Sequence, residues 1–253
     1  MFKNAIVRIP CPEMIEGLSS ASLGKPDYKK ALDQHASYVD ALQSCGLEVK
    51  VLKADSRFPD STFVEDVALC TPGCAIVTNP GAPSRNGEKQ EMEPVLQAFY
   101  ERMESITAPG TLDAGDVMMV GKLFYIGLSK RTNREGADQL IRILERYGMS
   151  GSTVPLNDML HLKSGISYLE QNKLLVTGEF NDHPAFAGFQ KIEVDPDEAY
   201  AANSLWINSA VLVPAGFPRT LKKIKQAGYQ TIVLDVSEFR KLDGGLSCLS
   251  LRF

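Results

Sequence analysis

The sequence predicts a pseudo-symmetric α/β propeller of five similar units, in a single domain that spans residues 1–253. Two observations lead to this fold class. The first is an order of elements that recurs four times: a polar loop, an apolar strand, a turn, a second apolar strand, an amphipathic helix and a short strand. The second is the spacing of the loops, which recur every ~40 to 50 residues, as in propeller repeats. These landmark loops contain residues 65–66, 113–116, 161–165, 201–204 and 243–248.

Pairs of apolar segments follow the first three landmark loops. The two segments of each pair are separated by a short turn that carries Gly, Asn or Lys, so we expect antiparallel hairpins. The expected pairs are residues 67–69 with 75–78, 117–120 with 123–126, and 166–169 with 174–176.

Two helices are expected where apolar residues recur with helical spacing, at residues 25–45 and 134–147. Asn133 is the expected N-cap of the second helix, because its side chain can accept a hydrogen bond from the first turn. The expected apolar faces contain Leu32, Val39 and Leu42 in the first helix, and Ala137, Leu140, Ile141 and Leu144 in the second.

The fifth unit is expected to combine the two ends of the sequence. Residues 248–252 supply a strand that no helix follows. We expect this strand to pair with residues 5–9, while helix 25–45 and strand 47–52 complete the unit. Such pairing closes a ring and leaves no free sheet edge between the first and last units. The five landmark loops would then converge on one central channel.

Composition excludes several classes of protein. Hydrophobic residues at 44% and charged residues at 23% are typical of a folded globular chain. A net charge of -4 leaves no basic excess to neutralise phosphates, so we expect no nucleic-acid partner. The sequence contains neither a secretory core nor an apolar run of roughly 20 residues, so we expect no membrane partner and a cytoplasmic location.

Five cysteines, an odd number without regular spacing, fit a reducing compartment better than a disulfide framework. Cys248 is the candidate for chemistry, because it follows two glycines and is expected to begin a strand, with backbone N–H groups near its sulfur. Cys70 and Cys74 lack a second pair of zinc ligands, so we expect no metal and no cofactor. The cysteines interpreted as packing or turn residues are Cys11, Cys45, Cys70 and Cys74.

Of three histidines, His161 is the one that opens a landmark loop. His35 lies in an expected helix, and His183 precedes a proline at an expected helix start. A thiolate nucleophile needs a nearby acid and base, which His161 would provide for Cys248. A Cys and a His in one predicted ring are weak evidence alone, and ordinary packing is the alternative.

Carboxylates cluster in the first two landmark loops: Asp60, Glu65, Asp66, Asp113 and Asp116. Solvated surface charge is one interpretation, but clustering at corresponding positions favours a pocket for a cationic ligand. Arg85 and Arg131 follow hairpins, and a guanidinium group binds a substrate carboxylate through two hydrogen bonds. Isolated surface arginines are the alternative for these two residues.

These residues lie in motifs that together resemble the dimethylarginine dimethylaminohydrolase family along the whole chain. Any one motif alone is weak, but the set is specific. The motifs are Phe-Pro-Asp at 58–60, Phe-Val-Glu-Asp at 63–66, Pro-Gly-Ala-Pro-Ser-Arg at 80–85, Thr-Leu-Asp-Ala-Gly-Asp at 111–116, Leu-Ser-Lys-Arg-Thr-Asn at 128–133, His-Leu-Lys-Ser at 161–164, Ala-Ala-Asn at 201–203 and Asp-Gly-Gly at 243–245. The family has the five-fold propeller of the guanidino-modifying (pentein) superfamily, in agreement with the repeats.

The resemblance implies a catalytic set of Cys248 as nucleophile, His161 as general acid and base, and Asp113 as the carboxylate that orients His161. Some relatives have Glu at the orienting position, and the shorter Asp113 could alter the placement of His161. The implied reaction converts Nω,Nω-dimethylarginine, or Nω-monomethylarginine, to citrulline and dimethylamine or methylamine. It proceeds through a covalent S-alkylthiouronium intermediate on Cys248, without metal or cofactor.

The resemblance also implies which residues bind the substrate. Asp66, with Glu65 beside it, would pair with the guanidinium group. Asp60 would receive the α-amino group, helped by main-chain carbonyls near Leu18 and Leu242. Arg85 and Arg131 would hold the α-carboxylate, while pocket shape near Phe63 and Leu18 would set the preference for methyl groups.

Two other functions stay open. An arginine deiminase uses the same thiolate chemistry on unmethylated arginine, and a propeller of this type can also be a non-catalytic binding protein. The expected partner is a small methylated arginine. The sequence is compatible with a homodimer but does not indicate the oligomeric state.

Overall fold

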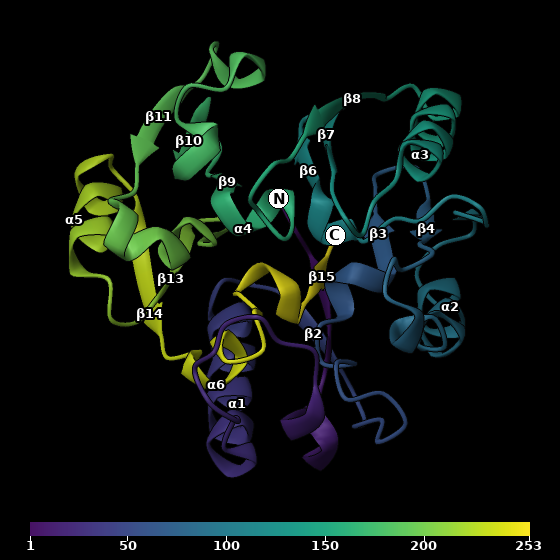
Figure 1. Cartoon of the computed structure of the whole chain (residues 1–253), viewed down its shortest axis with the longest axis horizontal. Helices are drawn as coiled ribbons and strands as arrows, with labels where there is room; N and C mark the ends of the chain where they lie inside the picture. Colours follow the sequence, from purple (N-terminus) through teal and green to yellow (C-terminus); the bar gives the residue numbers. More distant parts are fainter. The chain divides into compact units, whose positions relative to one another are not determined.

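The computed structural model describes residues 1–253, whose contacts group into two compact units. Unit 1 contains Met1–Val64 and Gly165–Phe253, and unit 2 contains Glu65–Ser164. Five three-stranded sheets run along the chain, three in unit 1 and two in unit 2 (Figure 1). None of the helices has the length and apolar character that crossing a bilayer requires. The single-domain organisation stays a prediction.

All five sheets share one internal order. The central strand pairs with one neighbour in the antiparallel sense and with the other in the parallel sense. A hairpin joins an antiparallel pair, but a parallel pair needs a longer crossover, usually a helix. Four of the five sheets have an α-helix in that crossover. The strand order predicted from the sequence is therefore present in all five sheets, and the predicted helix is present in four.

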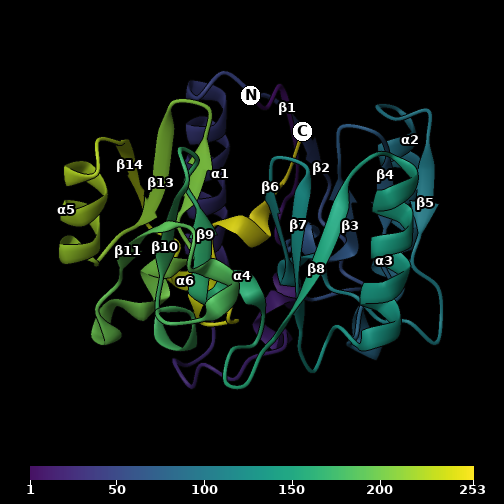
Figure 2. The same ribbon diagram turned by 90° about the horizontal axis from the view of Figure 1, so that it is seen from above.

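Unit 2 contains two of these sheets, each with a helix beside its parallel pair. Figure 2 shows α3 alongside β8, and Asn133 caps α3 by accepting a hydrogen bond from the N–H of Gly136 at 2.8 Å. The predicted cap is confirmed. The elements are β3 (Ala68–Cys70), β4 (Ala75–Val77), α2 (Glu88–Gln97) and β5 (Met103–Ser105), followed by β6 (Val117–Val120), β7 (Leu123–Leu128), α3 (Arg134–Arg146) and β8 (Ser150–Pro155).

In unit 1, two sheets are formed by consecutive strands. The elements are α4 (Leu162–Gly165), which begins in unit 2, then β9 (Ile166–Tyr168), β10 (Lys173–Val176), β11 (Gln190–Glu193), β12 (Leu205–Ile207), β13 (Ala210–Pro214), α5 (Pro218–Gln226), β14 (Gln230–Leu234) and α6 (Ser237–Arg240). The first of these sheets departs from the prediction of a helix in every repeat. Two 3-10 helices replace it, because Gly178 has a φ of 56° and Pro184 lacks a backbone N–H.

The third sheet of unit 1 joins the two ends of the chain. Strand β1 (Asn4–Arg8) lies between β15 (Leu251–Arg252) and β2 (Glu48–Leu52), with Ala5 opposite Arg252 (Figure 1). The predicted pairing of the chain ends is confirmed.

Helix α1 (Tyr28–Ser44) crosses from β1 to β2 and begins later than residue 25, because Asp27 caps it by accepting the N–H groups of Lys29 and Lys30 at 2.9 and 3.2 Å. Its buried face was predicted only in part. Leu42 is buried, but Leu32 and Val39 are half-buried, and the buried positions are Ala31, Gln34, His35, Tyr38, Ala41 and Leu42.

Short 3-10 helices shape the landmark loops and so position the candidate site residues. Helix η2 contains Glu65 and Asp66, η4 begins directly after Asp113, and η8 contains Cys248. The 3-10 helices are η1 (Pro12–Glu16), η2 (Val64–Val67), η3 (Pro83–Arg85), η4 (Ala114–Asp116), η5 (Gly178–Phe180), η6 (Pro184–Phe186), η7 (Pro196–Ala202) and η8 (Ser247–Leu249).

Candidate active site

Unit 2 brings three of the predicted residues together. His161, directly before α4, lies with its Nε2 3.1 Å from Oδ2 of Asp113, at the start of η4. One ligand atom of each of Asp66, Asp113 and His161 lies within 4.8 Å of the others, and all three residues are buried. Gly115 makes this approach possible, since a Cβ there would lie 2.8 Å from Asp66 and 3.0 Å from His161. The predicted orienting carboxylate is thus placed to orient His161.

The negative charges around His161 determine its protonation. Burial alone would lower its pKa, but the hydrogen bond with Asp113 and the charges of Asp66, Asp116 and Asp113 raise the pKa to about 9. His161 therefore carries a proton at neutral pH and can act as an acid. The chemistry of the three side chains would also suit a metal ion, so the expectation of no metal stays a prediction.

Arg85 is the centre of a buried ion-pair cluster that the sequence did not predict. Its Nη1 pairs with Asp66, while Nε and Nη2 donate to the two carboxylate oxygens of Glu88 at 2.9 and 2.7 Å. Burial opposes ionisation of Asp66, but the charges of Arg85, His161 and Lys163 hold its pKa below the ordinary value. The role predicted for Arg85, binding a substrate carboxylate, stays a prediction, and its neighbours show that it anchors Asp66.

Two further predicted residues of unit 2 have partners on neighbouring turns. Glu65 is buried and forms an ion pair of 2.6 Å with Lys163, which lies in the family motif but had been assigned no role. Arg131 is half-buried in the turn between β7 and α3, where its N–H donates to Ser129 Oγ at 3.0 Å.

In unit 1, Cys248 lies in η8 and not at the start of a strand, which corrects the sequence prediction. The 3-10 turn allows the N–H of Gly245 to donate to Cys248 Sγ at 3.4 Å. Asn203 holds the same loop, because its Oδ1 accepts the N–H of Ser247 and its Nδ2 donates to Ser247 Oγ, both at 3.0 Å. A Cβ at Gly245 would lie 2.4 Å from Asn203 Oδ1, so only glycine fits there.

Exposure distinguishes Cys248 from the other cysteines. Cys248 is half-buried, whereas Cys11, Cys45, Cys70 and Cys74 are buried, and none of the five is in a disulfide. A nucleophile must be reached by its substrate, so Cys248 is the cysteine that fits that role.

The remaining predicted residues are also in unit 1. Asp60 is buried, and its carboxylate accepts a hydrogen bond from the N–H of Leu18 at 3.1 Å. The main-chain group of Leu18 that contacts Asp60 is therefore its N–H and not its carbonyl. Leu18 itself is 41% exposed. Phe63 and Leu242 belong to one buried apolar cluster, where Phe63 packs edge-on against Phe239.

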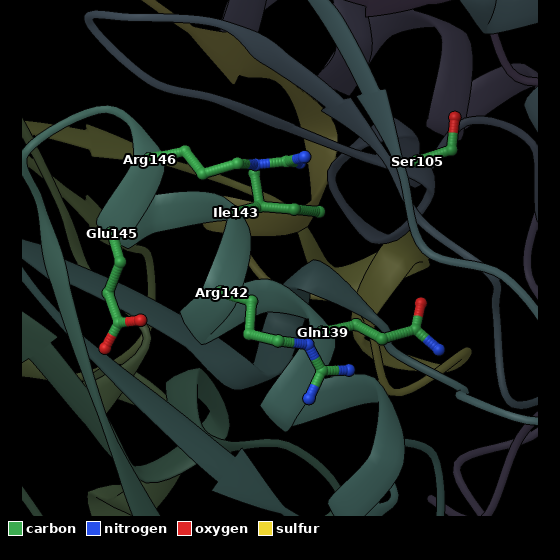
Figure 3. Close-up of a pocket in the computed structure, with 6 residues that line it drawn as sticks. All are labelled: Ser105, Gln139, Arg142, Ile143, Glu145 and Arg146. Carbon is green, nitrogen blue, oxygen red and sulfur yellow. The ribbon is translucent and has the colours of Figure 1, made fainter.

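A separate groove of about 580 Å³ lies beside α3 (Figure 3). It is lined by Ser105, Gln139, Arg142, Ile143, Glu145 and Arg146. Arg146 pairs with Glu104 at 2.7 Å, and no predicted site residue lines this groove. It is therefore not part of the candidate active site.

The repeated sheets, the acidic residues around His161 and the accessible thiol define a hydrolase of the guanidino-modifying class. A family model described as eukaryotic N,N dimethylarginine dimethylhydrolase matches residues 24–157. The N(G),N(G)-dimethylarginine dimethylaminohydrolase of Pseudomonas aeruginosa is 56% identical over 100% of both chains, and that of Streptomyces coelicolor is 34% identical over 99% of this chain and 96% of its own. The chain belongs to the dimethylarginine dimethylaminohydrolase family.

Solved structures agree with this membership. A cysteine-to-serine variant of the P. aeruginosa enzyme, complexed with citrulline, has a TM-score of 0.99 and 55% identity over 100% of both chains. The N-terminal domain of ArgZ, an arginine dihydrolase, has a TM-score of 0.89 at 16% identity over 100% of this chain and 98% of its own, a likeness of fold alone. The predicted fold class, an α/β propeller of five similar units, is confirmed by the five sheets and these matches.

Proposed function

We propose that the protein hydrolyses Nω,Nω-dimethylarginine to citrulline and dimethylamine, and Nω-monomethylarginine to citrulline and methylamine. The observation that carries the proposal is the buried group of Asp66, Asp113 and protonated His161 in a chain 56% identical to a named dimethylarginine dimethylaminohydrolase. The citrulline bound to the P. aeruginosa relative matches the proposed product.

Substrate charge is the first requirement of this chemistry. A guanidinium group stays protonated in water and its carbon is a poor electrophile, because the positive charge is delocalised. Asp66 and Asp113, with Glu65 beside them, would bind that charge and hold the central carbon toward Cys248. Positioning of this kind lowers the barrier by up to several kcal/mol.

Two half-reactions follow. The Cys248 thiolate forms a C–S bond to the guanidinium carbon, and the C–N bond to dimethylamine breaks as His161 gives its proton to the departing nitrogen. Neutral His161 then takes a proton from water, whose oxygen adds to the same carbon. Breaking of the C–S bond, with loss of the remaining hydroxyl proton to solvent, releases citrulline and restores the thiolate. His161 thus serves both halves.

The amino-acid end of the substrate needs its own contacts. We assign the α-amino group to Asp60, a buried carboxylate, and to main-chain carbonyls near Leu18 and Leu242. Arg131, half-buried on its turn, and Arg85 would hold the α-carboxylate. Phe63 and Leu18 would shape the space for the N-methyl groups.

The experiment is citrulline release from purified protein with asymmetric dimethylarginine, monomethylarginine and arginine in parallel, with a chelator throughout. Release from the methylated substrates only is the expected result, and it would show that no chelatable metal is needed. Release from arginine alone would make the protein a deiminase, and silence on all three would favour a binding protein.

A cytoplasmic location and a homodimer complete the proposal. The location is supported by the five cysteines, none of which is in a disulfide. Edge strand β2 supports a dimer, because Val51 on it is 42% exposed and an edge strand can pair with a second copy. Light scattering should give the mass of two chains; the mass of one chain would contradict the dimer.

A further inference from the structure

One buried carboxylate of unit 2 lies outside the predicted catalytic and binding set. Asp116, the last residue of η4, has no exposed surface. Its Oδ1 accepts the N–H of Leu162 at 2.9 Å, and its Oδ2 accepts the hydroxyls of Ser129 at 2.7 Å and Thr132 at 2.6 Å. A buried charge with three donors is a fixed point of the structure.

The partners of Asp116 belong to the segments that carry site residues. Leu162 directly follows His161 in the chain. Thr132 Oγ1 also accepts the N–H of Asp113 at 3.2 Å, and Ser129 Oγ accepts the N–H of Arg131 at 3.0 Å. One side chain therefore connects the segments of His161, Asp113 and Arg131.

Hydrogen-bond donors face both side-chain oxygens of Asp116, so both oxygens must act as acceptors. Ser129 Oγ accepts two backbone N–H groups, those of Arg131 and Thr132, so both its lone pairs are used and its one hydrogen goes to Asp116. An amide at position 116 would turn its NH₂ group either toward that filled hydroxyl or toward the N–H of Leu162. A carboxylate satisfies all three donors, whereas an amide cannot.

Asp116 also acts on His161 through its charge. Burial raises the pKa of Asp116, opposed by the charge of His161 and by the donors Thr132, Ser129 and Leu162. The charge of Asp116 in turn favours the protonated imidazole of His161, together with Asp66 and Asp113 and against the effect of burial. The other charged groups of this cluster are Arg85, Glu88, Glu65 and Lys163.

We propose that Asp116 is a positioning residue of the reaction, whose three hydrogen bonds hold the segments of His161, Asp113 and Arg131 in register and which places a fixed negative charge among them. The proposal rests on the function proposed above. It assigns to Asp116 no contact with substrate.

The test is Asp116→Asn, which keeps the shape of the side chain and removes its charge. We expect kcat to fall about 10- to 100-fold, by analogy with the hydrogen-bonded partners that orient metal-binding side chains. We also expect the alkaline limb of the kcat profile and the NMR titration of His161, assigned by comparison with His161→Gly, to move to lower pH. Asp138→Asn is the matched control, since Asp138 is 41% exposed on α3; it should change neither.

A folded Asp116→Asn protein with the wild-type titration of His161 would overturn the proposal. If that variant does not fold, Ser129→Ala removes one donor and leaves the charge. We then expect KM to rise about 10-fold through the loosened turn of Arg131 while the His161 titration stays in place; an unchanged KM would also overturn the proposal. The NMR titration needs no turnover, so it tests Asp116 even if wild-type protein releases no citrulline.

Discussion

In unit 2 the candidate residues are charged and lie in pairs, whereas in unit 1 neutral groups hold the loop of the nucleophile. Asp66 and Arg85 are buried, the side chain of His161 is 12% exposed, and each of the three has a partner of opposite charge. Cys248 is half-buried, and its loop is fixed by the amide of Asn203. Buried charges require partners, so the acid–base part is rigid before substrate binds. A thiol needs access, which neutral contacts at its back allow.

The largest effect should come from removing one reacting group from either unit. We expect Cys248→Ser and His161→Gly each to lower kcat by more than about 10³-fold, because the groups act as a unit. Circular dichroism should show intact folds. An active Cys248→Ser protein would contradict the assignment of the nucleophile to unit 1 and of the acid to unit 2.

Asp66→Asn in unit 2 should lower the free energy of unfolding more than a comparable change in unit 1. It removes one of the two carboxylates that pair with buried Arg85. We expect the free energy of unfolding to fall by about 3 kcal/mol, since breaking a buried ion pair leaves a charge uncompensated. Urea unfolding measures this loss. Asp55→Asn is the control, because the side chain of its partner Arg57 is 62% exposed, and it should cost less than about 1 kcal/mol.

His35 in unit 1 and His161 in unit 2 should affect the pH dependence of stability with opposite signs. Burial lowers the pKa of His35 to about 4, and its Nε2 has no hydrogen-bond partner. The folded state thus favours neutral His35, a contribution of about 3 kcal/mol that is present above pH 6.5 and lost as pH falls toward 4. The raised pKa of His161 makes its contribution complete below pH 6.5 and lost as pH rises through about 9.

Urea unfolding between pH 4 and pH 9.5 measures both contributions. His35→Phe, which cannot titrate, should flatten the acidic side of the stability profile, and His161→Gly should flatten the alkaline side. The same acid slope in His35→Phe and wild-type protein would contradict the assignment of His35.

Asn203→Ala should produce a smaller effect in unit 1. It removes two neutral hydrogen bonds to Ser247 and leaves the N–H of Ser247 without this acceptor. We expect a loss of about 1–3 kcal/mol in unfolding free energy and slower labelling of Cys248 by an amidine electrophile. Labelling at the wild-type rate would show that Asn203 does not position the thiol.

Arg142→Ala, in the groove beside α3, should have the smallest effect. Arg142 is mostly exposed and its contact with Glu135 is 3.5 Å. We expect a change within about 0.5 kcal/mol in stability and none in citrulline release. A large loss of activity would place a second functional site at this groove.

The sequence predicted the fold and the grouping in unit 2 better than it predicted the partners of the site residues. The repeated loops indicated that Asp66, Asp113 and His161 belong together, because each opens an equivalent unit. Glu88 could not be found that way, because it lies on helix α2, outside the loops, and a polar residue on a helix has no periodicity that would reveal a buried contact. Asn203 lies in a landmark loop and in a family motif, but its sequence position did not reveal that Ser247 is its partner.

Local backbone geometry accounts for the other differences. The 3-10 turn around Cys248 and the two 3-10 helices between β10 and β11 arise from short segments where Gly and Pro interrupt regular structure. Hydrophobic periodicity identifies long elements but does not resolve three-residue turns. A sequence signal was nevertheless present at Pro184, which can begin a short helix but not continue one.

The most direct test of the central claim is an acid quench of wild-type protein during turnover of asymmetric dimethylarginine, followed by mass spectrometry of the cysteine peptides. The account predicts an S-alkylthiouronium adduct on Cys248, present during turnover and absent from Cys248→Ser. Citrulline release with an adduct on another cysteine, or equal labelling of the Cys248→Ser protein, would contradict it.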